Sequence, residues 1–118
     1  DFVQRGGMIV VCSYQRNEFL LLNNSELMQV NRTGSSTEGL LSVAAVHPVT
    51  DGVPETFAAN YFGRFSSSDG TVLVRSTNND AVTLFKPVGA GHVMLIGTDF
   101  NVTNSPHDRM IANAVRLA

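Results

Sequence analysis

Cysteine and charged side chains are scarce in this sequence. Cys12 is the only cysteine among 118 residues, which excludes an internal disulfide bond and a metal site built from several cysteines. Charged residues make up 15% of the chain, against about 25% in an average soluble domain. The 8 Lys and Arg residues are dispersed, so the chain lacks the basic patch that nucleic-acid binding requires.

Long apolar runs and metal-ligand spacings are also missing. No apolar stretch approaches the roughly 20 residues of a membrane-spanning helix. The three histidines, His47, His92 and His107, form neither H-x-x-x-H nor H-x-H, so we predict no metal site and no cofactor. We expect His92 at the surface, and we expect His47, which precedes Pro48, to cap local structure.

Serine, threonine and asparagine take the place of the missing charges. This composition is common in secreted and cell-surface proteins and favours an extracytoplasmic location. At this length, residues 1–118 form one domain, which buries about two-thirds of its unfolded surface. Asp1–Arg5 followed by Gly6-Gly7 is typical of the last turn of a helix. We therefore expect a domain that is truncated at its N-terminus and excised from a longer protein.

Apolar runs and turn residues predict an α/β domain with a mixed sheet. Met8–Cys12 is a continuous apolar run, typical of a strand covered on both faces in a parallel sheet. Two helices are predicted, one from Asn17 to about Val30, with a break near Asn23–Ser25, and an amphipathic one from about Pro106. The other predictions are a loop at Asn31–Gly39, a strand or irregular aromatic segment at Thr56–Phe65, and strands at Leu40–Val46, Thr71–Arg75, Ala81–Lys86 and Val93–Ile96. Short turns join the last three strands, which predicts an antiparallel extension of the sheet near the C-terminus.

The carboxyl ends of Met8–Cys12 and Val93–Ile96 are where an open α/β sheet places its ligands. Cys12 and Ser13 follow the first of these strands, where a nucleophile on a sharp turn into a helix would be exposed. The alternative is that Cys12 is a small buried apolar residue. We favour this alternative because bulky neighbours replace the glycines that such a strained turn requires.

Two residues that follow the predicted strand Val93–Ile96 could act with Cys12 or Ser13 in such a catalytic site. His107 starts the final helix near Asp99, a suitable place for acid–base chemistry, although a helix-capping role is the favoured alternative. Asp99 either orients a ligand or accepts N–H bonds from the loop that follows it, and we favour the second role. The predicted ligand contacts at this edge are Ser13, Tyr14, Asp99, Phe100 and Asn101.

Several phrases of the sequence resemble the class I glutamine amidotransferase-like superfamily, in particular its ThuA-like and other non-amidotransferase branches. They occur in the family's order across nearly the whole chain and comprise Phe2–Val11, Asn17–Leu20, His47–Val53, Gly89–Phe100 and Met110–Leu117. The resemblance implies a flavodoxin-like three-layer α/β sandwich, of which the chain is the C-terminal part.

The chain departs from the family where glutamine is hydrolysed. Cys12 lies near the position of the family's nucleophile but lacks its flanking glycines, and Thr98–Val102 contains neither the His nor the Glu of the family's late catalytic pair. A glutamine-hydrolysing triad is therefore not predicted.

These observations predict a non-catalytic amidotransferase-like module of a larger protein, with a structural, ligand-binding or interaction role. One alternative is an amidase- or esterase-type hydrolase that uses Cys12 or Ser13 with His107 and Asp99. Another is a ThuA-like carbohydrate-related domain. The expected partners are the remainder of the parent protein or a second copy, paired through a sheet edge that lacks its neighbour, and the expected ligand is a small molecule or a carbohydrate.

Overall fold

The computed structural model describes residues 2–14, 17–98 and 106–117. Strands make up 49% of the chain and helices 19%. In chain order the elements are β1 (Met8–Cys12), α1 (Leu20–Asn24), β2 (Val30–Val43), the 3-10 helix η1 (Pro48–Thr50), β3 (Thr56–Ser67), β4 (Thr71–Ser76), β5 (Ala81–Val88), β6 (Gly91–Ile96) and α2 (Pro106–Leu117). No helix among these residues is long and apolar enough to cross a membrane.

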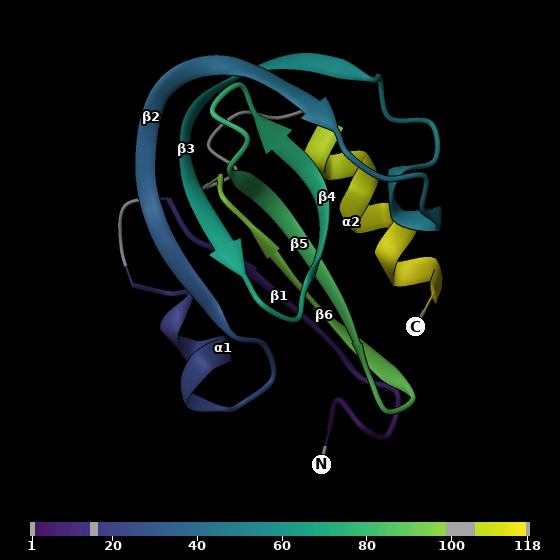
Figure 1. Ribbon diagram of the computed structural model, residues 1–118. Coiled ribbons are helices and arrows are strands. Elements are labelled where there is room, and N and C mark those ends of the chain that lie inside the picture. The colour runs from purple at the N-terminus through teal and green to yellow at the C-terminus, as the bar shows by residue number, and fades with distance from the viewer. Residues whose placement is uncertain (1, 15–16, 99–105, 118) are drawn as a thin grey trace.

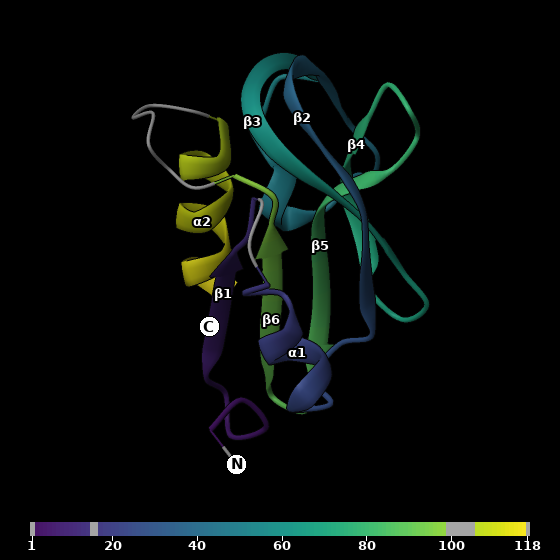
Figure 2. The same ribbon diagram turned by 90° about the vertical axis from the view of Figure 1, so that its left-hand side faces the viewer.

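The six strands form one sheet in the order β1-β6-β5-β3-β2-β4, and β4 also pairs with β5. This last pairing closes β2, β3, β4 and β5 into a ring of antiparallel strands, which we call the four-strand ring. Figure 1 shows the long strands β2 and β3 curving together over β4 and β5. Outside the ring, β6 pairs antiparallel with β5 and parallel with β1, and the three strands run side by side in Figure 2.

The four-strand ring shows that the prediction of a flavodoxin-like three-layer α/β sandwich is wrong. The segment Asn31–Gly39, predicted as a loop, is the central part of β2 and pairs with β3 from Asn31 opposite Ser66 to Gly39 opposite Ala59. Its polar residues alternate between half-buried and exposed positions. A strand with one face in water tolerates Ser and Thr on that face, so the polarity of this segment does not exclude a strand.

The helix predicted from Asn17 to about Val30 is also wrong in extent, because α1 stops at Asn24. Glu26 has a left-handed backbone with φ 61°, which a right-handed helix does not contain. The Asn23 side chain then accepts from the Val30 N–H (2.8 Å) and donates to the Val30 carbonyl (2.7 Å). These bonds hold the chain at the point where β2 begins.

The core lies on both sides of β6, whose six residues are all buried. Val93 and Leu95 pack in a cluster with Leu22 of α1, whereas Met94 and Ile96 pack in a second cluster with α2. The helical spacing predicts an apolar face on α2 made of Met110, Ile111, Ala114, Val115 and Leu117. Met110 and Ala114 are buried, but Val115 and Leu117 are 54% and 43% exposed. The predicted strand Met8–Cys12 and the predicted start of α2 at Pro106 are confirmed.

Candidate functional site

The ends of β1 and β6 meet the middle of β3. The Ser13 N–H donates to the Ile96 carbonyl (2.9 Å), and the Gly63 N–H donates to the Gly97 carbonyl (2.7 Å). Glycine permits this approach, because a Cβ on Gly63 would lie 2.7 Å from the Tyr14 carbonyl oxygen and 2.9 Å from that of Ser13. The candidate site is the edge formed by these three segments.

Ser13 is fully buried at this edge. Its hydroxyl donates to Oε1 of Glu18 (3.3 Å) and accepts from Nη2 of Arg32 (3.4 Å). The Arg32 guanidinium also lies 5.2 Å from the centre of the Phe19 ring, a cation–π arrangement. The buried hydroxyl therefore joins the exposed Glu18 to the half-buried Arg32, and a substrate would reach it only after the edge moved.

Tyr14 and Tyr61 form the aromatic part of the edge. Their ring centroids are 5.9 Å apart at an interplanar angle of 67°. Tyr61 is 50% exposed and has φ 55°, a left-handed conformation that costs a bulky residue about 1–2 kcal/mol. Backbone conformations of this kind concentrate at functional sites.

His107 lies on the α2 side of the sheet and is 1% exposed. Its Nε2 is 2.8 Å from the Thr83 hydroxyl, and its ring packs edge-on against Phe57. Burial lowers its pKa from 6.5 to about 4, against a smaller raising effect of the Asp108 carboxylate. The imidazole is therefore neutral at physiological pH and a weak base.

His107 and Cys12 lie on the same face of the sheet, near one line of paired residues that crosses β1, β6 and β5. Cys12 pairs with Ile96, and Ile96 pairs with Thr83 on the other side. Opposite residues of neighbouring strands share a face, so the Thr83 that binds His107 is two strands from Cys12. Cys12 is half-buried and packs on the cluster beneath α2. The hydrolase roles of Cys12, Ser13 and His107 stay predictions, and Asp99, Phe100 and Asn101 lie outside the described residues.

The other two histidines flank Phe85, with ring centroids 4.6 Å away for His47 and 5.1 Å away for His92. His92 is 4% exposed, so its expected place at the surface is wrong. Its ring contacts Phe85 and a backbone group of Ala114 in α2, which together help to cover it. Burial lowers the pKa of both rings, and the neighbouring His92 lowers that of His47 further.

His47 caps η1, as predicted. Its Nδ1 accepts from the Val49 N–H (3.1 Å), while the Thr50 hydroxyl accepts from the His47 N–H (3.2 Å). Among residues 2–14, 17–98 and 106–117, no group of three or more His, Cys, Asp or Glu side chains is placed to hold a metal ion.

Sequence reasoning identified Ser13 and Tyr14 as edge residues but missed Glu18, Arg32 and Tyr61. Arg32 lay in a predicted loop and Tyr61 in a segment assigned only as a strand or an irregular stretch. No local pattern marks them, because their neighbours at the site are distant in the sequence.

Comparisons with known proteins show the fold and no more. No protein-family model matches the chain, and no curated protein sequence matches it significantly. A ThuA-like protein from Bacteroides uniformis matches with a TM-score of 0.61 at 14% identity, over 98% of this chain and 60% of that one. A cytoplasmic protein from Salmonella typhimurium matches with a TM-score of 0.71 at 14% identity, over 97% and 56%. A β-galactosidase from Bacillus circulans matches with a TM-score of 0.63 at 12% identity, over 98% and 19%.

The neighbours include a ThuA-like protein, which agrees with the resemblance found in the sequence at the level of the fold. The chain spans between about a fifth and three-fifths of these three structures.

Proposed function

We propose that this chain is a carbohydrate-associated, ligand-binding module of a larger protein, with no chemistry of its own. Two features of the comparisons support this proposal. The fold occurs in a ThuA-like protein, and it occupies 19% of the chain of a β-galactosidase, where it is one part of a longer polypeptide.

The observation that carries the binding role is the pair Tyr14 and Tyr61. Tyrosine offers a flat apolar face with a polar tip, which suits the C–H face and the hydroxyls of a sugar ring. Tyr61 presents such a ring at the surface from a strained backbone conformation. Ser13, Glu18 and Arg32 are hydrogen-bonded at the same edge and add polar groups to it.

Two features support the absence of chemistry. Ser13 is fully buried, and its hydroxyl donates to Glu18. His107 has a pKa of about 4 and is bonded to Thr83. A general base at neutral pH has a pKa much nearer 7.

Tyr61→Ala should weaken binding of a β-linked galacto-oligosaccharide about fivefold, because stacking on an aromatic ring contributes roughly 1 kcal/mol. Isothermal titration calorimetry measures the effect. Leu40→Ala is the matched control, since Leu40 is a 48% exposed apolar residue on the neighbouring strand β2. Equal affinities of Tyr61→Ala and the unmodified protein, or equal losses in the two variants, would contradict the proposed site.

A second substitution separates binding from stability. Tyr61→Gly removes the same ring but accepts the left-handed backbone, so it should be about 1 kcal/mol more stable than Tyr61→Ala. Both variants should bind equally poorly. Urea denaturation measures the difference, and a glycine variant less stable than the alanine variant would show that Tyr61 is not strained.

We further propose that β1 pairs with the remainder of the parent protein, or with a second copy when the chain is alone. Within the described residues β1 has one neighbour, β6, and stands at the end of the sheet. An open strand edge is a template for pairing. Light scattering should show a rise in mass with concentration, together with slower hydrogen exchange of the β1 amides. A constant monomer mass with fast exchange in β1 would contradict this pairing.

A further inference from the structure

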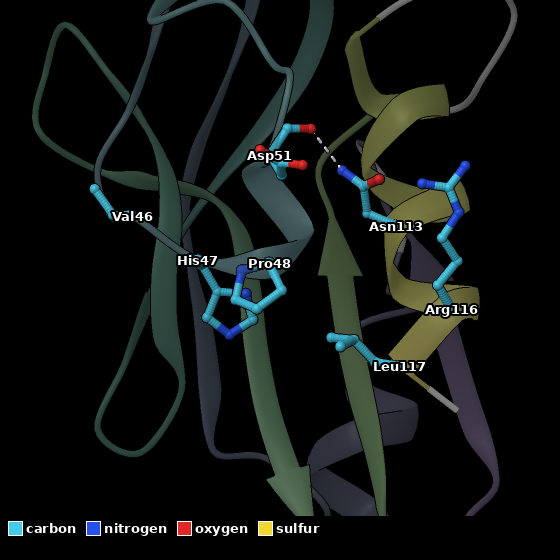
Figure 3. A pocket seen from close by; sticks show the side chains of 7 residues that line it. All are labelled: Val46, His47, Pro48, Asp51, Asn113, Arg116 and Leu117. Atoms are coloured by element: carbon cyan, nitrogen blue, oxygen red, sulfur yellow. Dashed lines mark hydrogen bonds between the residues drawn. The ribbon is translucent and has the colours of Figure 1, made fainter.

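A cavity lies between the η1 turn and the C-terminal half of α2, away from the start of α2 at Pro106. Its volume is about 480 Å³, within the usual range of roughly 300–1,000 Å³ for small-molecule sites. Figure 3 shows the seven side chains that line it. They are Val46, His47, Pro48, Asp51, Asn113, Arg116 and Leu117.

Hydrogen bonds fix the walls of this cavity. The Asn113 side-chain amide, on α2, donates to the carbonyls of Val49 and Asp51, both at 2.8 Å. Asn113 is 5% exposed; its bond to the Val49 carbonyl is buried and its bond to the Asp51 carbonyl is partly buried. The two Asn113 bonds attach η1 to α2. The bond from the Val49 N–H to Nδ1 orients the His47 ring. The lining is therefore held in place before any ligand arrives.

The cavity combines three polar functions with an apolar surface. Because Nδ1 of His47 accepts a hydrogen bond, the neutral ring carries its hydrogen on Nε2 and can donate from that atom. Asp51 offers a carboxylate and Arg116 a guanidinium. Val46, Pro48 and Leu117 supply apolar contact.

Asp51 and Arg116 are unpaired in the part of the chain that the structure describes. The ion pairs there join Arg64 to Asp80 and Lys86 to Asp69. In Figure 3 Asp51 and Arg116 stand on separate walls of the cavity. Two opposite charges that face one cavity without neutralising each other favour a ligand that carries both an anionic group and hydrogen-bond donors.

We propose that this cavity binds a compact carboxylate that also carries hydroxyl groups, a sugar acid. Arg116 takes the carboxylate, because a guanidinium matches its geometry with two parallel hydrogen bonds. Asp51 accepts hydrogen bonds from the hydroxyls, and the carbon skeleton lies against Pro48 and Leu117. The choice of a sugar acid rests on the proposed carbohydrate association, whereas the charge pattern stands independently of it.

The test is a titration of the whole chain with glucuronate, glucose and alanine, followed by NMR chemical shifts. Glucuronate should bind and shift the amides of η1 and α2, whereas glucose and alanine should bind at least tenfold more weakly. Arg116→Gln should weaken glucuronate binding at least tenfold, and Asp51→Asn should weaken it several-fold. Arg109→Gln removes the same charge from the same helix outside the cavity lining, so its affinity should stay within twofold.

Three results would overturn the proposal. They are equal binding of glucose and glucuronate, binding of alanine without glucuronate, and an unchanged affinity in Arg116→Gln. A negative result at this cavity can be distinguished from a negative result at Tyr61, because the cavity is probed with a charged monosaccharide and Tyr61 with a neutral oligosaccharide. Glucuronate bound here with no oligosaccharide bound at Tyr61 would leave the cavity assigned and the Tyr61 site rejected.

Discussion

Lowering the pH from 7 to 4 should cost the protein about 3 kcal/mol of unfolding free energy through His107 alone. Burial holds the pKa of this ring at about 4, against 6.5 for an exposed histidine. A difference of one pKa unit corresponds to about 1.4 kcal/mol between the two protonation states. The side chain is 1% exposed, so little of this effect is lost to solvent screening.

The sign of this effect follows from proton binding. Below pH 6.5 the unfolded chain protonates its histidine, while the folded protein keeps His107 neutral until the pH approaches 4. The unfolded state then binds more protons, so stability falls as the pH falls through this window. Well above pH 6.5 His107 is neutral in both the folded and the unfolded state, so the protein keeps its full unfolding free energy. His47 and His92 also have lowered pKa values and contribute in the same direction.

His107→Gln isolates the contribution of this ring. Glutamine retains an amide that can hydrogen-bond Thr83 and does not titrate. We expect the variant to be less stable at pH 7, because the ring contact with Phe57 is lost. Its further loss between pH 7 and 4 should be about 3 kcal/mol smaller than that of the unmodified protein. Urea denaturation at each pH, followed by circular dichroism, measures both, and equal pH slopes would contradict the prediction.

Gly97→Ala should destabilise the protein by about 3 kcal/mol, at the upper end of the usual cost of overpacking. A Cβ at this position would overlap the carbonyl oxygen of Gly63. That atom belongs to the backbone of β3, so relief requires two paired segments to separate. The Gly63 to Gly97 hydrogen bond (2.7 Å) would stretch with them. Because this bond joins the end of β6 to the strand that carries Tyr61, binding of the oligosaccharide should also fall.

Gly39→Ala is the matched control for this substitution. Gly39 is also a strand glycine, but a Cβ there would meet only the Phe62 ring, at 3.2 Å from Cζ. A side chain can shift by a few tenths of an ångström, so we expect a change within about 1 kcal/mol. Denaturation midpoints of the two variants measure the contrast. Equal stabilities would show that the contact between β3 and β6 is looser than the backbone geometry indicates.

Prediction from the sequence succeeded where neighbouring residues decide the structure. The apolar run Met8–Cys12 is β1, the turn residues before Ala81 do end β4 and begin β5, and His47 caps the helical turn that starts at Pro48. In each case the signal is an apolar run, a turn dipeptide or a capping side chain within a few residues. These interactions are the same in any chain that carries the local pattern.

Prediction from the sequence failed where the structure of a segment depends on a partner distant in the chain. Nothing local distinguishes Asn31–Gly39 from a polar loop, and it becomes a strand because β3 supplies its hydrogen bonds. The flavodoxin-like prediction failed for the same reason, since the four-strand ring depends on pairings of β2 with β4 and of β4 with β5. The burial of His92 likewise depends on contacts with distant residues, namely Phe85 of β5 and Ala114 of α2.

The features of the candidate sites also separate into those that the sequence predicts and those that depend on packing between distant segments. Composition predicts no nucleic-acid binding, the family resemblance predicts no glutamine-hydrolysing triad, and the apolar run Met8–Cys12 places Ser13 and Tyr14 just after a strand. The contact of Tyr14 with Tyr61, the low pKa of His107 and the cavity between η1 and α2 follow from packing between segments far apart in the chain. Local sequence sets which residues form β1 and α2, whereas long-range pairing sets what surrounds them, because burial and charge depend on neighbours in space.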